Sequence, residues 1–279
     1  MRLGAAIGPY STPEQWIDLH VREGYGAAYC PVTQADTEET LLAYRRAAES
    51  HNLVIAEVGV WNNLLDADAA RRKANFEYSI GQMRLADKLG ARCCVNISGS
   101  LSDAWDGPHP MNLTPATFDR VVEITQALID ESGIQHTYYT LEPMPWMYPC
   151  DVESSLKLIE AVNRPQFAVH VDLCNLVNSY EKFCHTGDLV RSYFAALAPH
   201  IRSIHAKDIV IGKHLTLHLD EAIPGEGVFD FDALLIEAAK LDDIPIMAEH
   251  LSTQEQYRKA TSYLRSRAQA LNLPLDTAS

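Results

Sequence analysis

Short apolar segments alternate with longer helix-like segments along the whole chain. Apolar runs of strand length, each followed by a helical pattern, predict strand–helix units, and such units in series build parallel sheets. Eight units follow one another without a low-complexity linker. The predicted strands cover residues 3–8, 27–32, 54–61, 91–98, 137–143, 167–173, 201–206 and 244–251. The predicted helices begin near residues 12, 36, 66, 114, 152, 188, 231 and 253.

Eight such units in 279 residues predict an α/β fold, a single-domain (β/α)8 or TIM barrel, for which about 250 residues are typical. The competing architecture is a doubly wound open sheet, which commonly carries Gly-x-Gly-x-x-Gly after its first strand. The corresponding segment here is IGPYSTPE, which lacks that pattern. We therefore expect one barrel domain over residues 1–279.

Two of the predicted strand-to-helix connections, residues 98–112 and 209–229, are long. Within the second, HLTLHLDE alternates apolar and polar residues at the period of a strand. This alternation predicts a small β-ribbon insertion at about 209–229, over the active face. Because the strand-to-helix loops of a barrel line that face, their extra length points to a site there.

Acidic residues outnumber basic ones, with 37 Asp and Glu against 23 Lys and Arg and a net charge of −14. Such a chain repels phosphate backbones and anionic lipid, so we expect no nucleic-acid and no membrane partner. The first residues lack the apolar core of a signal peptide, and no apolar run approaches the ~18 residues of a membrane span. Six cysteines without a CxxC pair are typical of reduced thiols. These features predict a cytoplasmic protein.

Four ionisable residues end consecutive predicted strands at one depth. They are Glu142, Asp172, His205 and Glu249. Catalytic groups of a (β/α)8 barrel project from the carboxyl ends of its strands, and the fifth to eighth strands form one side of the barrel. We therefore expect these side chains to converge. Three carboxylates and one imidazole suit Mn²⁺, Mg²⁺, Co²⁺ or Zn²⁺, so the pattern predicts one divalent metal ion.

Two histidines and a glutamate in the same strands have less specific roles. His170 is expected deeper in the barrel, as a hydrogen-bonded core or supporting residue. His250 follows the last predicted ligand, so it is expected to point to the opposite face of the strand, toward a helix. Glu57, inside the third strand, either binds substrate or pairs with a neighbour.

Four motifs stand at these strand ends: LEPMPW (141–146), HVDLCN (170–175), IHAKD (204–208) with PGEGVFDF (224–231), and MAEH (247–250). Together they resemble the xylose-isomerase-like TIM barrels, a superfamily that includes sugar phosphate isomerases and epimerases. The resemblance covers essentially the whole chain. Its most specific part is the PGEG segment followed by the start of a helix.

The resemblance implies that the four strand-end residues bind one divalent metal, in the first instance Mn²⁺, and that Glu142 and Glu249 act as acid and base. Asn175 stands where ketose 3-epimerases of the family commonly have a histidine. In this position the chain resembles the branch acting on pentulose phosphates, yet no Arg or Lys cluster for a phosphate accompanies it. Members often form dimers or tetramers, so the expected assembly is a homodimer or homotetramer.

Several residues near the predicted metal site are candidates for substrate contacts. Lys207 either binds a substrate oxygen or carboxylate or forms a salt bridge with Asp208 or another neighbour. Trp146, after the fifth strand, is expected as an apolar wall for the C–H face of a sugar. His218 in the predicted ribbon and Asn175 complete the candidates.

These residues predict a metal-dependent isomerase or epimerase of a ketose, keto-sugar or sugar phosphate, acting through a metal-stabilised enediolate. The alternative is a lyase or decarboxylase that forms the same enediolate from a 3-keto sugar derivative or a 3-oxo sugar acid. A DNA-repair endonuclease with this barrel would need more histidine ligands and a basic face. A non-catalytic sugar-binding protein would not need two carboxylates beside one metal. The expected partner is therefore a small-molecule sugar substrate.

Overall fold

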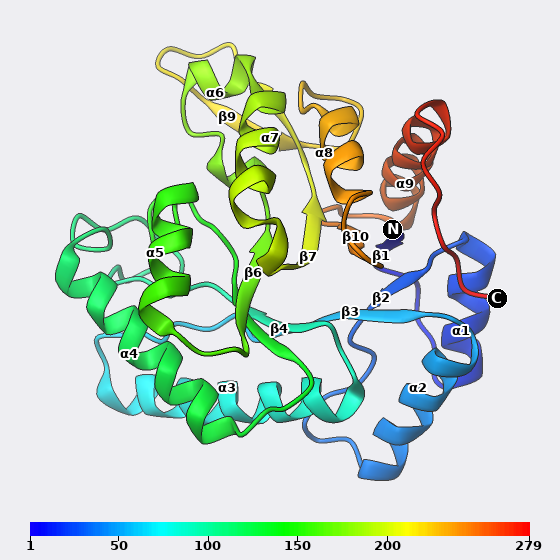
Figure 1. The fold of residues 1–279 in the computed structure, drawn as a ribbon, viewed down its shortest axis with the longest axis horizontal. Helices are drawn as coiled ribbons and strands as arrows, with labels where there is room; N and C mark the ends of the chain where they lie inside the picture. Colours follow the sequence, from blue (N-terminus) through cyan, green and yellow to red (C-terminus); the bar gives the residue numbers. More distant parts are fainter.

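Eight parallel strands close into a barrel in the computed structural model, which describes residues 1–279 (Figure 1). Their order around the barrel is β1-β10-β7-β6-β5-β4-β3-β2, so successive units lie side by side. The predicted (β/α)8 fold is confirmed, and each predicted strand overlaps an observed one. The barrel strands are β1 (Arg2–Ala5), β2 (Ala27–Tyr29), β3 (Val54–Gly59), β4 (Cys93–Asn96), β5 (Tyr138–Leu141), β6 (Phe167–Val171), β7 (Ile201–Ala206) and β10 (Pro245–Ala248).

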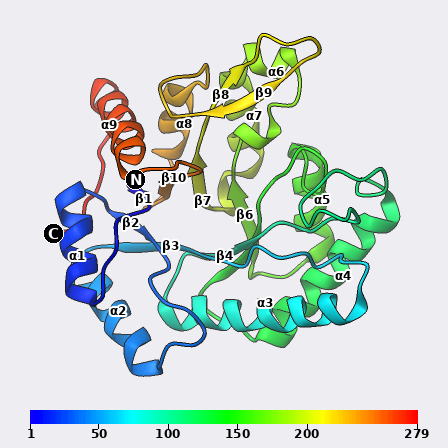
Figure 2. The ribbon, with the colours of Figure 1, turned by 180° about the vertical axis from the view of Figure 1, so that it is seen from behind.

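Helices lie outside the barrel in both views (Figures 1 and 2). Most begin at a capping side chain, since Thr12, Thr37 and Asp68 each accept a hydrogen bond from a first-turn backbone N–H. None of the helices combines the length and apolar character that a membrane span requires. The main helices are α1 (Pro13–Glu23), α2 (Glu38–Ser50), α3 (Ala69–Leu89), α4 (Pro115–Ser132), α5 (Val152–Val162), α7 (Thr186–Leu197), α8 (Phe231–Ala238) and α9 (Gln254–Ala270). Three short helices were not predicted: η1 (Cys174–Leu176), α6 (Tyr180–Cys184) and η2 (Ala198–His200).

Apolar side chains fill the space between strands and helices in two large clusters, one containing Trp16 and the other Phe231. The barrel interior is different, because its hydrophobic cluster, of Ala27, Ala56 and Met247, is small. Toward the carboxyl ends of the strands the buried interior side chains are polar or charged. Burial there therefore depends on hydrogen bonds and charge pairing rather than on apolar contact.

The first and last strands of the barrel close it. β1 pairs with β10 along its whole length, from Arg2 opposite Pro245 to Ala5 opposite Ala248. The chain after α9 then runs back across the amino-terminal units, where the backbone N–H of residue 276 donates to the carbonyl of residue 1. Further along, the N–H groups of residues 278 and 279 donate to the carbonyls of residues 25 and 51.

An antiparallel ribbon of β8 (Asp208–Ile211) and β9 (Leu219–Ala222) follows β7, in the part of the chain where an insertion was expected. Of the HLTLHLDE segment whose alternation indicated the ribbon, only the last three residues lie in β9. Pairing of Ile211 with Leu219 places residues 214–218 in the turn. The buried Asp208 carboxylate anchors the insertion by accepting four backbone N–H bonds of 2.8–2.9 Å, from residues 209, 225, 227 and 229. Gly227 is required here, since a Cβ would lie 2.2 Å from Asp208 Oδ1.

Candidate active site

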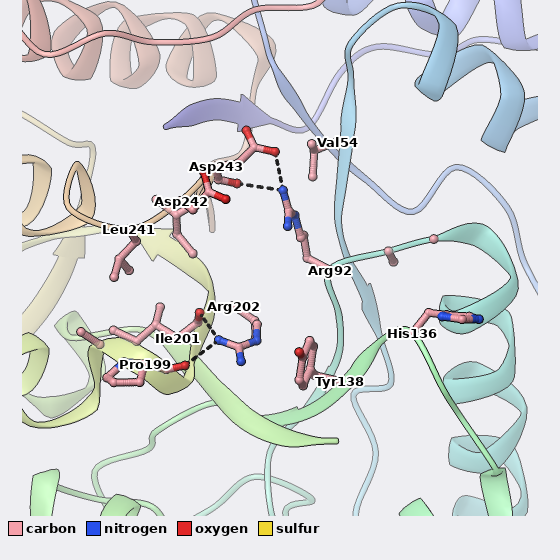
Figure 3. A pocket seen from close by; sticks show the side chains of 14 residues that line it. Val54, Arg92, His136, Tyr138, Pro199, Ile201, Arg202, Leu241, Asp242 and Asp243 are labelled. Carbon is pink, nitrogen blue, oxygen red and sulfur yellow. Dashed lines mark hydrogen bonds and ion pairs between the residues drawn. The ribbon is translucent and has the colours of Figure 1, made fainter. Parts of the chain in front are cut away.

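Two cavities lie at opposite ends of the barrel, and the one at the amino-terminal ends of the strands measures about 590 Å³ (Figure 3). Asp243 pairs there with Arg92 and also with Arg2. Arg202 lies 4.2 Å over the ring of Tyr138 and donates to nearby backbone carbonyls. The charged groups at this end are therefore paired with one another or with backbone carbonyls. They connect the starts of the strands, so their role is to stabilise the barrel. Active sites of this fold lie at the other end.

The second cavity, of about 440 Å³, opens at the carboxyl ends of the strands. Glu142 directly follows β5, Asp172 follows β6 and Glu249 follows β10, while His205 is the last residue but one of β7. One possible ligand atom from each lies within 4.8 Å of the others. The structure thus brings together the four residues expected to converge, which we call the four-residue cluster.

The facing atoms of the four-residue cluster are close but make few hydrogen bonds. Nδ1 of His205 lies 2.9 Å from Glu249 Oε2 and 3.6 Å from Glu142 Oε1. Asp172 Oδ2 is 3.8 Å from the same nitrogen. None of these contacts of His205 Nδ1, Asp172 Oδ2 and Glu249 Oε2 has hydrogen-bond geometry, and the two carboxylate oxygens are held in ion pairs with Lys207. Neighbouring ligands of an octahedral ion with bonds of ~2.1 Å are about 3 Å apart, so the donors and their spacing fit a divalent cation.

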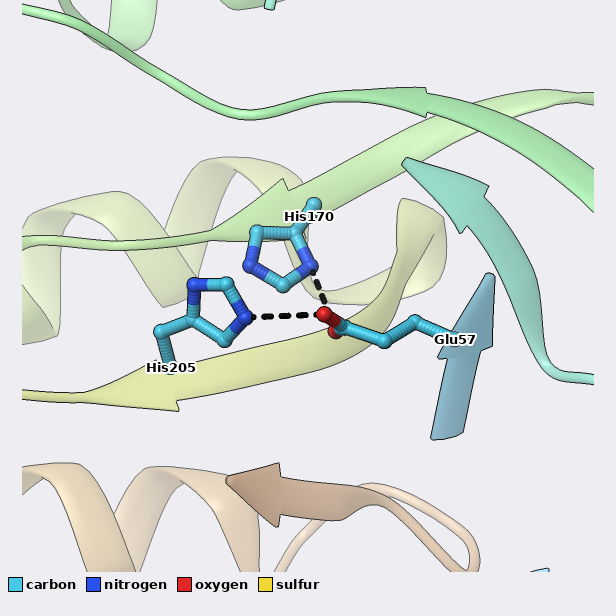
Figure 4. A group of neighbouring side chains, drawn as sticks. All are labelled: Glu57, His170 and His205. Carbon is cyan, nitrogen blue, oxygen red and sulfur yellow. Dashed lines mark hydrogen bonds and ion pairs between the residues drawn. The ribbon is translucent and has the colours of Figure 1, made fainter. Parts of the chain in front are cut away.

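Glu57 determines which nitrogen of His205 faces the cluster (Figure 4). His205 Nε2 lies 3.1 Å from Glu57 Oε1, and Ser203 Oγ donates to the other carboxylate oxygen at 3.1 Å. Although burial favours the neutral acid, His205 holds the pKa of Glu57 below its usual value. An ionised carboxylate only accepts hydrogen bonds, so Nε2 carries the hydrogen and Nδ1 is the nitrogen that can bind a metal.

Burial alone lowers the pKa of His205, but the charges of Glu57 and Glu249 outweigh it and raise that pKa well above the usual range. His205 therefore holds a proton when no metal ion is bound at the cluster. Metal binding to an imidazole requires its neutral form and releases the proton. The environment that attracts the proton would attract a divalent ion in the same way.

Of the two roles left open for Glu57, substrate contact and pairing with a neighbour, the geometry favours the second. This side chain is only 2% exposed and does not line the cavity, so it pairs with neighbours instead. The cause is a β-bulge: Ala28 pairs with Ile55 but Tyr29 pairs with Glu57, which leaves Ala56 as the extra residue of β3. A bulge changes the direction of the following side chain, and here it directs Glu57 under His205.

His170 is a buried core residue as expected, but it is not hydrogen-bonded. Its ring centroid lies 4.0 Å from that of His205, and Nδ1 is 3.6 Å from Glu57 Oε2. Neither ring nitrogen has a hydrogen-bond partner. Burial, followed by the charge of His205, lowers the pKa of His170 to about 3. It is therefore a neutral ring on which His205 packs.

Lys207 forms salt bridges with neighbouring carboxylates of the cluster, one of the alternatives left open for it, and not with Asp208, whose carboxylate binds backbone N–H groups. Lys207 Nζ lies 2.8 Å from Asp172 Oδ2 and 2.9 Å from Glu249 Oε2. Burial by itself lowers the pKa of Lys207, but the surrounding carboxylates, Asp172 and Glu142 first, raise it well above the usual range. The ammonium stays charged and offsets one of the three carboxylate charges.

Asn175 holds one of the two glutamates in place. Its Nδ2 donates to Glu142 Oε1 at 2.9 Å and to the Pro143 carbonyl at 3.2 Å. Burial raises the pKa of Glu142 to about 7, although His205 opposes this rise. Burial by itself would also raise the pKa of Glu249, but the charge of His205 outweighs burial and lowers the pKa of Glu249. The two glutamates therefore sit in different electrostatic environments.

The cavity wall carries the predicted Trp146 together with residues that sequence reasoning missed. Trp61, Trp105 and Asp106 line it, and so does Glu221 of β9. The length of loop 98–112 was a signal for Trp105 and Asp106. Trp61 lies at the end of the predicted third strand, with no pattern that marks it as a cavity residue.

His250 faces a different side than predicted, and His218 lies in the predicted ribbon but outside the cavity lining. His250 does not pack toward a helix, because its left-handed backbone (φ 56°) breaks the alternation of the strand. It lines the cavity, and its Nδ1 is 2.9 Å from Glu221 Oε2. His218 was expected to contact substrate, but it lies in the ribbon turn, exposed, with its ring against His214 and outside the cavity lining.

Comparison with known sequences places the site in context. Residues 23–267 match the sequence model of the family described as xylose isomerase-like TIM barrel. The chain matches no curated protein.

Similar solved structures share the barrel. A xylose isomerase-like TIM barrel protein from Mycobacterium smegmatis, in complex with magnesium, is 14% identical with a TM-score of 0.66, covering 93% of this chain and 90% of its own. A probable 3-DHS dehydratase, AsbF, from Bacillus anthracis is 14% identical with a TM-score of 0.69, covering 97% and 98%. A D-psicose 3-epimerase determined with D-fructose is 15% identical with a TM-score of 0.63, covering 98% and 97%. At these identities the likeness shows a common fold.

Proposed function

The chain belongs to the xylose isomerase-like TIM barrel family, and on that premise we propose that it is a divalent-metal-dependent isomerase or epimerase of a keto sugar. The observation that carries the proposal is the four-residue cluster, whose ligand atoms lie within 4.8 Å of one another at the carboxyl end of the barrel. Glu142, Asp172, His205 and Glu249 would hold the ion. When bound, it would polarise the substrate carbonyl and stabilise the negative charge that forms on proton removal.

The two glutamates would move the protons. Glu142 follows β5 and Glu249 follows β10, and β6 and β7 lie between these strands in the barrel wall. The carboxylates therefore reach the cavity from two sides of the cluster. One removes a proton from the carbon beside the carbonyl and the other delivers a proton to the opposite face, which inverts that carbon. Delivery at the neighbouring carbon instead gives isomerisation.

Other residues would orient these groups and the substrate. Asn175 restrains the carboxylate of Glu142 through its 2.9 Å hydrogen bond. Lys207, charged and buried against Asp172 and Glu249, limits the repulsion among the carboxylates. General acid–base catalysis by positioned carboxylates contributes about 10²–10⁴ in rate.

A lyase is the second candidate, because the same proton removal can expel a leaving group from a keto sugar. A probable dehydratase is among the proteins of similar fold, beside epimerases that include a D-psicose 3-epimerase and a 3-keto-D-glucoside 4-epimerase. The products separate the candidates. An epimerase or isomerase returns an intact sugar, whereas a lyase releases a smaller product or water.

The test begins with metal content. Protein purified without chelators is analysed by elemental mass spectrometry beside Asp172→Ala, Glu249→Gln and the surface control Glu160→Gln. We expect about one Mn, Mg, Co or Zn ion per chain in the wild type and the control, and loss of the ion in the two site variants.

Keto sugars are then incubated with the loaded enzyme in deuterated water. Deuterium in the recovered intact sugar supports the isomerase or epimerase, and a dehydrated product supports the lyase. Failure of added Mn²⁺ to bind the wild type contradicts both.

A further inference from the structure

Three of the four tryptophans of the chain line the cavity above the four-residue cluster. Trp61, Trp105 and Trp146 expose 39%, 42% and 37% of their surface, whereas Trp16 is buried in the core. They come from three separate segments, after β3, in loop 98–112 and after β5. Large apolar rings exposed together in a concave site mark a surface for a ligand.

The indole rings are held in place by the fold. The ring centroid of Trp61 lies 6.5 Å from that of His205, so this indole borders the cluster itself. A Cβ at Gly59 would lie 2.1 Å from Trp61 Nε1, so this glycine makes room for the ring. Trp146 Nε1 donates to the Asp106 carbonyl at 2.7 Å, which ties the β5 loop to loop 98–112. Rigid aromatic walls bind at low entropic cost.

The charges around the cavity disfavour an anionic ligand. Carboxylates of Asp106, Glu142, Glu221 and Glu249 line the cavity, which contains no arginine. Its lysine, Lys207, has Nζ within 3.7 Å of carboxylate oxygens from four residues, Glu221 among them. Apart from the ion proposed for the four-residue cluster, and with His250 paired to Glu221, a phosphate or carboxylate group would meet like charge with no side-chain cation left to pair it.

The helix ends that commonly bind phosphate in this fold are already occupied. In (β/α)8 barrels a phosphate often binds at helix amino termini beyond the seventh and eighth strands. At α8 the Asp230 side chain accepts the Ala233 N–H, and Asp232 adds a second negative charge. At α9 the Gln256 side chain accepts the backbone N–H groups of residues 252 and 253, and Glu255 is acidic.

From these observations we propose that the cavity binds an uncharged sugar derivative in ring form, with its ketone on the ring, and excludes sugar phosphates and sugar acids. The flat C–H face of a sugar ring can pack on the face of an indole ring. An open-chain sugar has no such flat face. The inference rests on the proposed function for its chemistry and adds the class of substrate to that function. A ketone already on the ring needs no ring opening, so epimerisation next to that ketone is favoured over aldose–ketose isomerisation.

Binding measurements test the proposal with a readout other than activity. Titration calorimetry of the Mn²⁺-loaded protein uses methyl 3-keto-D-glucopyranoside, its 6-phosphate and D-erythrulose, a ketose too short to close a ring. We expect the uncharged glycoside to bind at least tenfold more tightly than either of the others. Equal or tighter binding of the 6-phosphate or of erythrulose overturns the proposal, and so does a failure of the glycoside to bind at millimolar concentration.

Variants of the indoles test the packing surface. We expect Trp61→Leu and Trp146→Leu each to weaken glycoside binding about threefold to tenfold, the range of an aromatic contact beyond its buried area. Trp146→Phe should restore most of the affinity, and the remote exposed control Tyr78→Leu should change nothing. Mn²⁺ affinity should be the same in all variants. Wild-type glycoside affinity in both leucine variants overturns the proposal.

The binding and turnover measurements together can refute this inference and the proposed function independently of each other. Tryptophan-dependent binding of the glycoside without deuterium exchange or product release overturns the proposed function and supports the binding mode. Turnover of a sugar phosphate in preference to the glycoside supports the proposed function and overturns the inference.

Discussion

Replacing Glu57 by Gln should weaken metal binding although Glu57 does not face the cavity. The carboxylate accepts from His205 Nε2 at 3.1 Å and from Ser203 Oγ at 3.1 Å, with its pKa held low. A neutral amide is a weaker acceptor, and it can also turn its NH₂ group toward His205. That orientation would favour the tautomer with hydrogen on Nδ1, the nitrogen that faces the four-residue cluster.

The size of the effect follows from the contact that is lost. A hydrogen bond to a charged group contributes about 1.5–3 kcal/mol, against about 1 kcal/mol for a neutral one. Loss of groups that orient metal ligands typically costs 10- to 100-fold in affinity, which is about 1.4–2.8 kcal/mol. The two estimates agree, so we expect Glu57→Gln to lower Mn²⁺ affinity about tenfold. Glu57→Ala, which leaves His205 Nε2 unpaired in the core, should lower it about 100-fold.

Competition against a fluorescent chelator measures these affinities, and urea denaturation of the metal-free proteins checks that each variant is folded. Ser203→Ala is the matched control, because it removes one hydrogen bond to Glu57 but keeps the contact with His205. It should bind Mn²⁺ within about threefold of the wild type. Wild-type affinity in folded Glu57→Gln, together with loss of the metal in His205→Asn, would refute the argument about the tautomer.

Three further predictions concern other parts of the fold. Asn175→Ala removes the hydrogen bond to Glu142 and should lower kcat about 10- to 100-fold in steady-state kinetics, so unchanged turnover would contradict its positioning role. Asp208→Ala removes the acceptor of four backbone N–H bonds and should cost about 3–4 kcal/mol of unfolding free energy in urea, whereas Asp220→Ala on the exposed ribbon should cost little. Burial lowers the pKa of His20 to about 4, so the unfolded chain binds a proton at this residue more readily than the folded chain does. The free energy of unfolding therefore has its full contribution from His20 above about pH 6.5, and this contribution falls by about 3 kcal/mol as the pH approaches 4. His20→Gln should lose less stability than the wild type between pH 7 and pH 4.5, and parallel losses would contradict this assignment.

The residues that could be placed from sequence lie where a strand ends. Glu142, Asp172 and Glu249 each follow an apolar run directly, so the end of the run determines both their depth and their neighbours. The apolar runs themselves located the strands because burial between two layers requires them. Local pattern was sufficient for these features.

Features that depend on irregular backbone could not be placed in the same way. Glu57 is directed inward by the bulge at Ala56, and His250 faces the cavity because of its left-handed backbone. Strict alternation along the strand would predict neither. His218 depends on the register of the ribbon, which HLTLHLDE does not determine, since the pattern is equally compatible with a turn earlier or later. The cavity tryptophans lie in loops without a period.

The pairing of β1 with β10 has a consequence for how this protein is made. Arg2 lies opposite Pro245, so the barrel cannot close until the ribosome has synthesised nearly the whole chain. Until then β1 and β7 present open sheet edges, which are templates for pairing with other chains. Nascent chains of this protein should therefore depend on chaperones during late synthesis, and stalling before residue 245 should produce aggregates rather than a smaller folded domain.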